Sequence, residues 1–238
     1  MAKTKTRNKN RKRKFLRCVV LVAIVFVASF LLAASSAILP KITDFFAKEQ
    51  TYATTEHGWN LILINKDNYI PEDYEVKLLK LSNGEKVDER IYPDLQKMFD
   101  DARAAGLELF VAQGYRTEIE QKRLLDQKQE AYENEGNSPA EAKELAEKWV
   151  AVPGTSEHQL GIAVDINADE EKCKPDDVYS WLSENAHKYG FINRYPADKT
   201  KITGIIYEPW HYRYVGKEAA GEIYEKGICL EEYIESIE

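Results

Sequence analysis

Four residues in two short segments have the side-chain types that a catalytic metal site requires. His158 and Asp165 lie in the first segment, and Glu208 and His211 lie in the second. The two imidazoles and the carboxylate of Asp165 form a three-ligand set for zinc, which leaves the fourth tetrahedral position open for water. Such a centre lowers the pKa of water toward about 7. Glu208 then remains free to take the proton of that water and to pass it to a leaving amine.

Each of these residues also has a structural interpretation. A lone histidine such as His158 is more often a surface or satisfied core residue than a ligand. Asp165 lies within an apolar run, where a carboxylate is costly unless it is paired or bound to a metal. At the end of a strand, however, it could bond backbone amides instead. Glu208 and His211 face one ion only if the backbone bends around Pro209, because positions three apart in a strand point in opposite directions.

Other polar residues are candidates for contacts with a substrate. Arg116 follows an apolar run in a Gly-Tyr-Arg turn, and its guanidinium could hold a carbonyl oxygen as negative charge develops there. A surface salt bridge is the alternative for this arginine. Ser156 and Gln113 are candidates for hydrogen bonds to the substrate. Arg213 could bind a carboxylate or simply buttress the site.

Hydrophobic periodicity and turn residues predict the elements that position these side chains. Helices and strands alternate without a strict βαβ rhythm, which favours a single α+β domain with one sheet. Strands are predicted at residues 59–64, 107–112, 161–166 and 212–215. Helices are predicted at residues 93–105, from Thr117 to about 132, from Ser138 to about 150, at 178–189 and at 217–225.

The amino-terminal region has the charge and hydropathy pattern of a membrane anchor. Nine of the chain's 33 Lys and Arg residues lie within residues 1–17, which contain no acidic residue. Residues 18–39 carry no charge and are long enough to cross a bilayer core of about 30 Å. The basic tail predicts a cytoplasmic amino terminus, followed by a stalk at 40–57 and an extracytoplasmic domain at 58–238. A cleaved signal peptide is the alternative, and it would export the same domain.

The body that follows the anchor is acidic, because all 40 Asp and Glu residues lie there with only 24 of the 33 Lys and Arg residues (33 minus nine). Binding to nucleic acid requires clustered Lys and Arg, so the sequence argues against a nucleic-acid partner. Cys173 and Cys229 lie in the exported part and could form a disulfide or remain two separate thiols.

The two segments resemble the zinc D-alanyl-D-alanine carboxypeptidases of the VanY type. The matching motifs are Ser156-x-His158-x-x-Gly161-x-Ala163-x-Asp165 and Glu208-x-Trp210-His211, and the resemblance extends over roughly residues 58–220. It implies an α+β fold with a central antiparallel sheet and zinc on His158, Asp165 and His211. It also implies Glu208 as general base and Arg116 as the group that stabilises the transition state.

The implied reaction is removal of the C-terminal D-amino acid from peptidoglycan stem peptides. Ser156-Glu157-His158-Gln159 is also similar to the first motif of a related L,D-carboxypeptidase, which trims tetrapeptide stems. Two further alternatives are an endopeptidase that cuts cross-links and a non-catalytic module that binds the cell wall. Glu208 argues against the binding module, which has no need of a base.

Overall fold

The computed structural model describes residues 50–238. The predicted tail at 1–17, the predicted transmembrane segment at 18–39 and most of the predicted stalk lie outside these residues. Among residues 50–238, no helix has both the length and the apolar character that crossing a membrane requires. Residues Thr51–Tyr52 (β1), which we expected in the stalk, pair in parallel with Asn68–Tyr69 (β2). The chain therefore contacts the folded body before residue 58.

Four antiparallel strands form the central sheet, in the order β5-β6-β8-β7. They are β5 (Leu109–Gln113), β6 (Ala163–Ala168), β7 (Phe191–Asn193) and β8 (His211–Tyr214). A separate antiparallel hairpin consists of β3 (Leu78–Lys80) and β4 (Lys86–Asp88). The helices are α2 (Tyr92–Ala104), α3 (Glu118–Asn134), α4 (Pro139–Glu147), α5 (Pro175–Asn185), α6 (Thr200–Thr203), α7 (Lys217–Lys226) and α8 (Leu230–Ile237), with short 3₁₀ turns η1 (Glu157–Leu160) and η2 (Ala186–Tyr189). This arrangement confirms the α+β class and the central antiparallel sheet.

The alternation of side chains along the strands separates the core from the polar face of the sheet. Val164 and Ile166 of β6 and Tyr212 of β8 belong to the main hydrophobic cluster. Successive side chains of a strand point to opposite faces, so Asp165 and His211 project from the face opposite this core. The pairing of β6 with β8 places these two residues directly across from each other. The sheet register thus brings two predicted ligands together.

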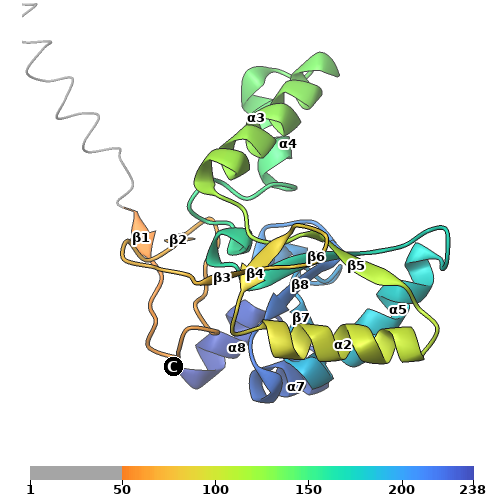
Figure 1. Cartoon of the computed structure of the whole chain (residues 1–238). Coiled ribbons are helices and arrows are strands. Elements are labelled where there is room, and N and C mark those ends of the chain that lie inside the picture. The colour runs from red at the N-terminus through yellow and green to blue at the C-terminus, as the bar shows by residue number, and fades with distance from the viewer. Residues whose placement is uncertain (1–49) are drawn as a thin grey trace, which may run out of the picture. The chain divides into compact units, whose positions relative to one another are not determined.

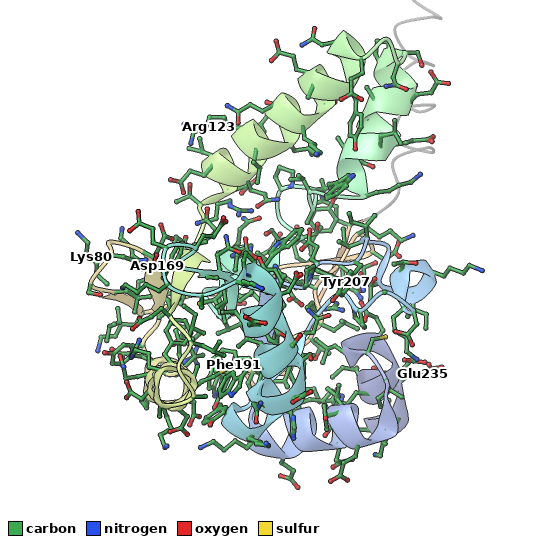
Figure 2. The ribbon with its side chains drawn as sticks, turned by 90° about the vertical axis from the view of Figure 1, so that its right-hand side faces the viewer. Lys80, Arg123, Asp169, Phe191, Tyr207 and Glu235 are labelled. Carbon is green, nitrogen blue, oxygen red and sulfur yellow. The ribbon has the colours of Figure 1, made fainter. Side chains whose placement is uncertain are left out.

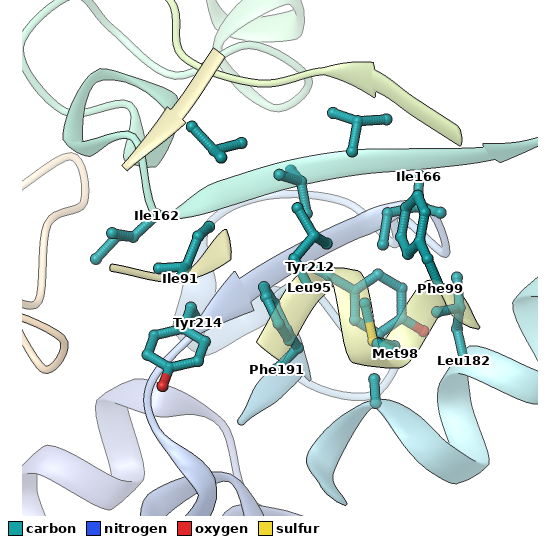
Figure 3. Packing of buried hydrophobic residues seen from close by; sticks show 14 of the residues in the cluster. Ile91, Leu95, Met98, Phe99, Ile162, Ile166, Leu182, Phe191, Tyr212 and Tyr214 are labelled. Atoms are coloured by element: carbon teal, nitrogen blue, oxygen red, sulfur yellow. The ribbon is translucent and has the colours of Figure 1, made fainter. Parts of the chain in front are cut away.

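The helices α2 and α5 cover the apolar face of the sheet (Figures 1 and 3). Leu95, Met98 and Phe99 of α2 recur at helical spacing and pack with Phe191 and Tyr212 in the same cluster. Pro93 lies in the first turn of α2, where its missing amide proton costs nothing. The core therefore packs against one face of the two central strands. The opposite face carries Asp165 and His211.

The helices α3 and α4 form a pair that extends away from the sheet (Figures 1 and 2). Both begin with capping boxes, formed by Thr117 with Glu120 and by Ser138 with Glu141, which satisfy amides at the helix start. Gln121 is the only buried residue of α3. Local capping therefore stabilises the start of both helices, and α4 also buries Ala142 and Ala146.

The predicted strand at residues 59–64 is wrong, because this segment has no sheet partner. Its even-numbered residues Ile62 and Ile64 pack into the main cluster, whereas Leu61 and Leu63 pack against a second cluster beneath α7 and α8. The alternation that resembles a strand arises because the segment runs between two apolar clusters. Its carbonyl groups at 60 and 62 accept hydrogen bonds from the Arg213 side chain at 3.1 and 2.9 Å.

The bounds of the other predicted elements agree with the structure to within a few residues. One predicted helix is divided into two elements. The predicted helix at 178–189 consists of α5 followed by η2, and Gly190 ends it with a φ of +86°. The short strand β7, the β3-β4 hairpin and α8 were not predicted. Both Cys173 and Cys229 are free thiols, so the disulfide alternative is not formed in this structure.

Candidate active site

Three residues from separate elements converge to form a group that could hold a metal ion. His158 lies in η1, Asp165 in β6 and His211 at the first position of β8. One ligand atom from each lies within 4.8 Å of the other two. His158 Nε2 is 3.4 Å and His211 Nδ1 is 3.0 Å from Asp165 Oδ1. The structure thus brings together the three residues that the sequence indicated.

The donor set and its spacing fit zinc. Zinc binds imidazole nitrogen and carboxylate oxygen at about 2.0–2.2 Å, in tetrahedral geometry. Ligand atoms around such an ion lie about 3.3 Å apart, close to the 3.0 and 3.4 Å found here. His158 donates from Nδ1 to the Gly114 carbonyl at 2.8 Å, which leaves Nε2 free as a ligand atom.

The electrostatics of the ligands depend on burial and on neighbouring charges. Burial lowers the pKa of His158, and the carboxylate of Asp165 only partly offsets this. Burial acts in the same direction on His211, but its interactions with the nearby carboxylates of Asp165 and Glu157 raise its pKa to about 9. A metal ion that binds His211 must therefore displace a proton at neutral pH, so metal affinity should rise with pH.

Glu208 lies beside the three ligands on a turn that precedes β8. Its Oε2 is 3.7 Å from His211 Nδ1, and Pro209 and Trp210 form the bend that the sequence required. Its backbone is fixed by hydrogen bonds to Tyr195 and Asn193. Burial raises the pKa of Glu208 to about 7, with a further contribution from Asp165. A carboxylate with a pKa near neutrality suits a general base.

Arg116 faces the same group from the turn after β5. Its Nη1 donates to Gln121 Oε1 at 2.7 Å, and its backbone amide donates to the His158 carbonyl at 3.1 Å. Gln121 is itself fixed by a 2.6 Å hydrogen bond to the Ala151 carbonyl. Burial lowers the pKa of Arg116, while Asp165 and Glu208 are among the carboxylates that raise it. An arginine side chain remains charged in such surroundings, so a cation lies next to the ligands.

These side chains line a cavity of about 270 Å³. Leu124 and Lys128 of α3 and Trp149 after α4 form part of its wall. The projecting helices therefore contribute side chains to the wall of the site. The residues with predicted roles that line this cavity are Arg116, Ser156, His158, Asp165, Glu208 and His211.

Two predicted substrate contacts occupy other places. Gln113 lines a neighbouring polar cavity, which Arg116 also borders, and its amide donates to Glu85 at 3.4 Å. The structure contradicts a direct substrate contact for Arg213, because its side chain is fully enclosed. Its guanidinium bonds Glu157 and backbone carbonyls. Arg213 therefore has the buttressing role, which was the alternative.

Sequence reasoning missed a buried group of charges behind the site. Glu157 is enclosed between Arg194 and Arg213, and its Oε1 accepts hydrogen bonds from both at 2.8 Å. Burial acts to raise the pKa of Glu157, but the two guanidinium groups hold it well below its usual range. No local feature of the polar run Thr155-Ser156-Glu157-His158-Gln159 marks this glutamate as buried, because its two arginine partners lie far along the chain.

The raised pKa of Glu208 predicts a pH-dependent effect on the stability of the metal-free protein. The folded state holds this proton more tightly than the unfolded chain, so ionisation lowers stability as the pH rises from about 4.5 to about 7. Glu208→Gln removes this cost. It should raise the free energy of unfolding relative to the native sequence by up to about 3 kcal/mol more at pH 8 than at pH 4.

Urea unfolding of the wild type and of Glu208→Gln, both treated with a chelator to remove metal, measures this difference at the two pH values. An equal effect of the substitution at pH 4 and pH 8 would contradict the raised pKa. Zinc should reduce the difference, because a nearby cation favours the ionised carboxylate.

Comparison with known proteins agrees with the site. The family model of VanY, described as D-alanyl-D-alanine carboxypeptidase, matches residues 84–217. A D-alanyl-D-alanine carboxypeptidase of Enterococcus faecalis (strain ATCC 700802 / V583) is 56% identical over 192 residues, which cover 79% of this chain and 72% of that protein.

Two solved structures are similar over most of the described part of the chain. VanYB in complex with D-alanine-D-alanine is 57% identical, with a TM-score of 0.75, over 76% of this chain and 99% of that one. A mutant of the vancomycin resistance D,D-pentapeptidase VanY from a VanB-type cassette, in complex with Zn(II), is 58% identical, with a TM-score of 0.73, over 74% and 99%. With this family match and identity added to the convergence of His158, Asp165 and His211, the chain belongs to the VanY family of D-alanyl-D-alanine carboxypeptidases.

Proposed function

We propose that the chain is a zinc-dependent carboxypeptidase that removes the terminal D-alanine from peptidoglycan stem peptides ending in D-alanyl-D-alanine. The observation that carries this function is one cavity that holds a His-Asp-His ligand group, the buried carboxylate of Glu208 and the guanidinium of Arg116. The membership of the VanY family and the zinc in a solved relative support it. The chain is accordingly a hydrolase.

Each residue has a distinct role in this reaction. Zinc held by the three ligands would supply Lewis acidity and make water acidic enough to attack near neutral pH. Glu208 takes the proton of the attacking water and delivers it to the leaving amine as the carbon–nitrogen bond breaks. Arg116 donates hydrogen bonds to the carbonyl oxygen as it gains negative charge. Ser156, which is buried at the cavity wall, is positioned to donate to the substrate.

The substrate class can be tested with stem peptides of different length. The purified full-length protein should shorten a pentapeptide stem by one D-alanine, as read by mass spectrometry, and a chelator should abolish this activity until zinc is added back. Trimming of the tetrapeptide in preference would indicate an L,D-carboxypeptidase. Separation of cross-linked peptides would indicate an endopeptidase, and no change in any substrate would leave only a binding role.

We also propose that residues 18–39 anchor the protein in the cytoplasmic membrane with the catalytic domain outside. The nine basic residues before an uncharged stretch of this length support that orientation. The reaction requires the same side of the membrane, because the cell wall lies there. Protease added to intact protoplasts should digest a tag fused to the carboxyl terminus and spare one fused to the amino terminus. Digestion of the amino-terminal tag alone would reverse the assignment.

A further inference from the structure

The two histidines of the ligand group use opposite ring nitrogens, and different groups hold their other nitrogens. His158 directs Nε2 toward Asp165, and the Gly114 carbonyl accepts from its Nδ1. His211 directs Nδ1 toward Asp165, so its Nε2 must carry the ring proton when Nδ1 is a ligand. An acceptor is therefore needed on the far side of the His211 ring.

Among the described residues, Glu157 places an acceptor opposite that proton. Its Oε2 lies 3.6 Å from His211 Nε2. Both atoms are sealed from solvent, and neither has a hydrogen-bond partner among residues 50–238. The separation exceeds a normal hydrogen bond by roughly 0.5 Å. Two unsatisfied buried atoms of complementary character thus face each other.

The surrounding charges keep this second oxygen free for His211. A single oxygen of Glu157, Oε1, accepts from both Arg194 and Arg213. Arg194 already has a bidentate pair with Glu231 of α8, at 2.6 and 2.8 Å. The ion pairs with the two arginines account for Oε1 of Glu157 only. They leave Oε2 without a partner, so they do not explain why that oxygen is buried beside His211.

We infer that Glu157 is a positioning residue, which fixes the tautomer and the ring orientation of His211 by accepting its Nε2 proton. A carboxylate in this place also makes the imidazole a stronger ligand. The chain of contacts runs from Glu231 in the carboxyl-terminal helix through Arg194 and Glu157 to the ligand. This inference rests on the proposed zinc site.

The zinc-loaded wild-type protein provides the first test. Long-range ¹H–¹⁵N NMR of the full-length chain should show His211 protonated at Nε2 and His158 protonated at Nδ1. The Nε2 proton of His211 should be shifted downfield and protected from exchange. Binding of zinc through Nε2 of His211, or a rapidly exchanging Nε2 proton, would overturn the inference. Failure of the wild-type protein to bind zinc would instead overturn the proposed function.

The second test is the substitution Glu157→Gln, which keeps the size of the side chain. The glutamine side chain has one oxygen and one NH₂ group. If its oxygen accepts from the two arginines, its NH₂ group faces the Nε2 proton of His211 and cannot accept it. If its oxygen faces His211, the NH₂ group faces the two arginines, which are also donors. Zinc affinity, measured by competition with a chelator, should fall about 10- to 100-fold. The Co²⁺-substituted variant should also show an altered visible spectrum.

The matched control is Glu232→Gln on α8, which loses an ion pair with Lys199 but has no contact with the ligand group. Its zinc affinity should stay within twofold of the wild type. A Glu157→Gln variant that folds like the wild type and keeps its zinc affinity within twofold would refute the positioning role. If that variant does not fold, the His211 proton in the wild-type protein decides the question alone.

Discussion

Replacement of Glu208 with glutamine should lower kcat on a pentapeptide stem by about 10² to 10⁴-fold, while the protein still binds zinc. The amide has the size of the carboxylate but cannot accept the proton of the attacking water. Glu208 is not part of the three-residue ligand group, so its loss leaves the metal donors in place. The effect should fall on kcat, because the lost interaction belongs to the transition state.

Two measurements on the same variant make this prediction specific. Zinc content by metal analysis should match the wild type, and far-UV circular dichroism should be unchanged. Full activity in a zinc-loaded Glu208→Gln protein would exclude Glu208 as the base. Loss of both zinc and activity would show that Glu208 acts as a ligand.

The grouping of the three candidate metal ligands was predictable from the sequence. The ligands lie at or beside the central strands β6 and β8, where an apolar alternation indicated strands and a carboxylate within the run was costly without a partner. A bend at Pro209 was expected because Glu208 and His211, three positions apart, would point in opposite directions in a regular strand. These arguments need only local sequence, and the sheet register then brings Asp165 and His211 face to face.

The errors arose where distant contacts decide the outcome. The segment containing Ile62 and Ile64 has the alternation of a strand, but a side chain, Arg213, satisfies its carbonyl groups instead of a neighbouring strand. The same contacts hold the Arg213 side chain in the interior, where it cannot reach a substrate in the cavity. No local pattern distinguishes an arginine that faces a cavity from one that faces the backbone of a segment about 150 residues away. Glu157 was missed for the same reason, because its partners come from β8 and from the loop after β7.

Replacement of Arg116 with alanine should lower kcat by about 10² to 10³-fold with little change in zinc content. The guanidinium lies in the cavity with Glu208 and the ligand group, where exclusion of water strengthens its interaction with a developing negative charge. Arg116→Lys should recover only part of the loss, because an ammonium keeps the charge but lacks the planar pair of donors.

Arg123 on α3 provides the matched control (Figure 2). It is an exposed arginine that borders the neighbouring cavity but not the one that contains the ligand group. Arg123→Ala should leave kcat within twofold of the wild type. Equal losses in the two variants would show that the net positive charge near α3 matters, and not the placement of one guanidinium.

Gln121 allows the placement of Arg116 to be tested separately from its charge. The Gln121 side chain links the Arg116 guanidinium to the Ala151 carbonyl, so Gln121→Ala should reduce kcat, but less than Arg116→Ala does. If Gln121 acts only through Arg116, the double variant should be no slower than Arg116→Ala alone, which a double-mutant cycle measures directly. Fully additive losses would mean that Gln121 has a separate role in the cavity. A non-additive result would show that the projecting helix α3 contributes to catalysis by holding a cation in place.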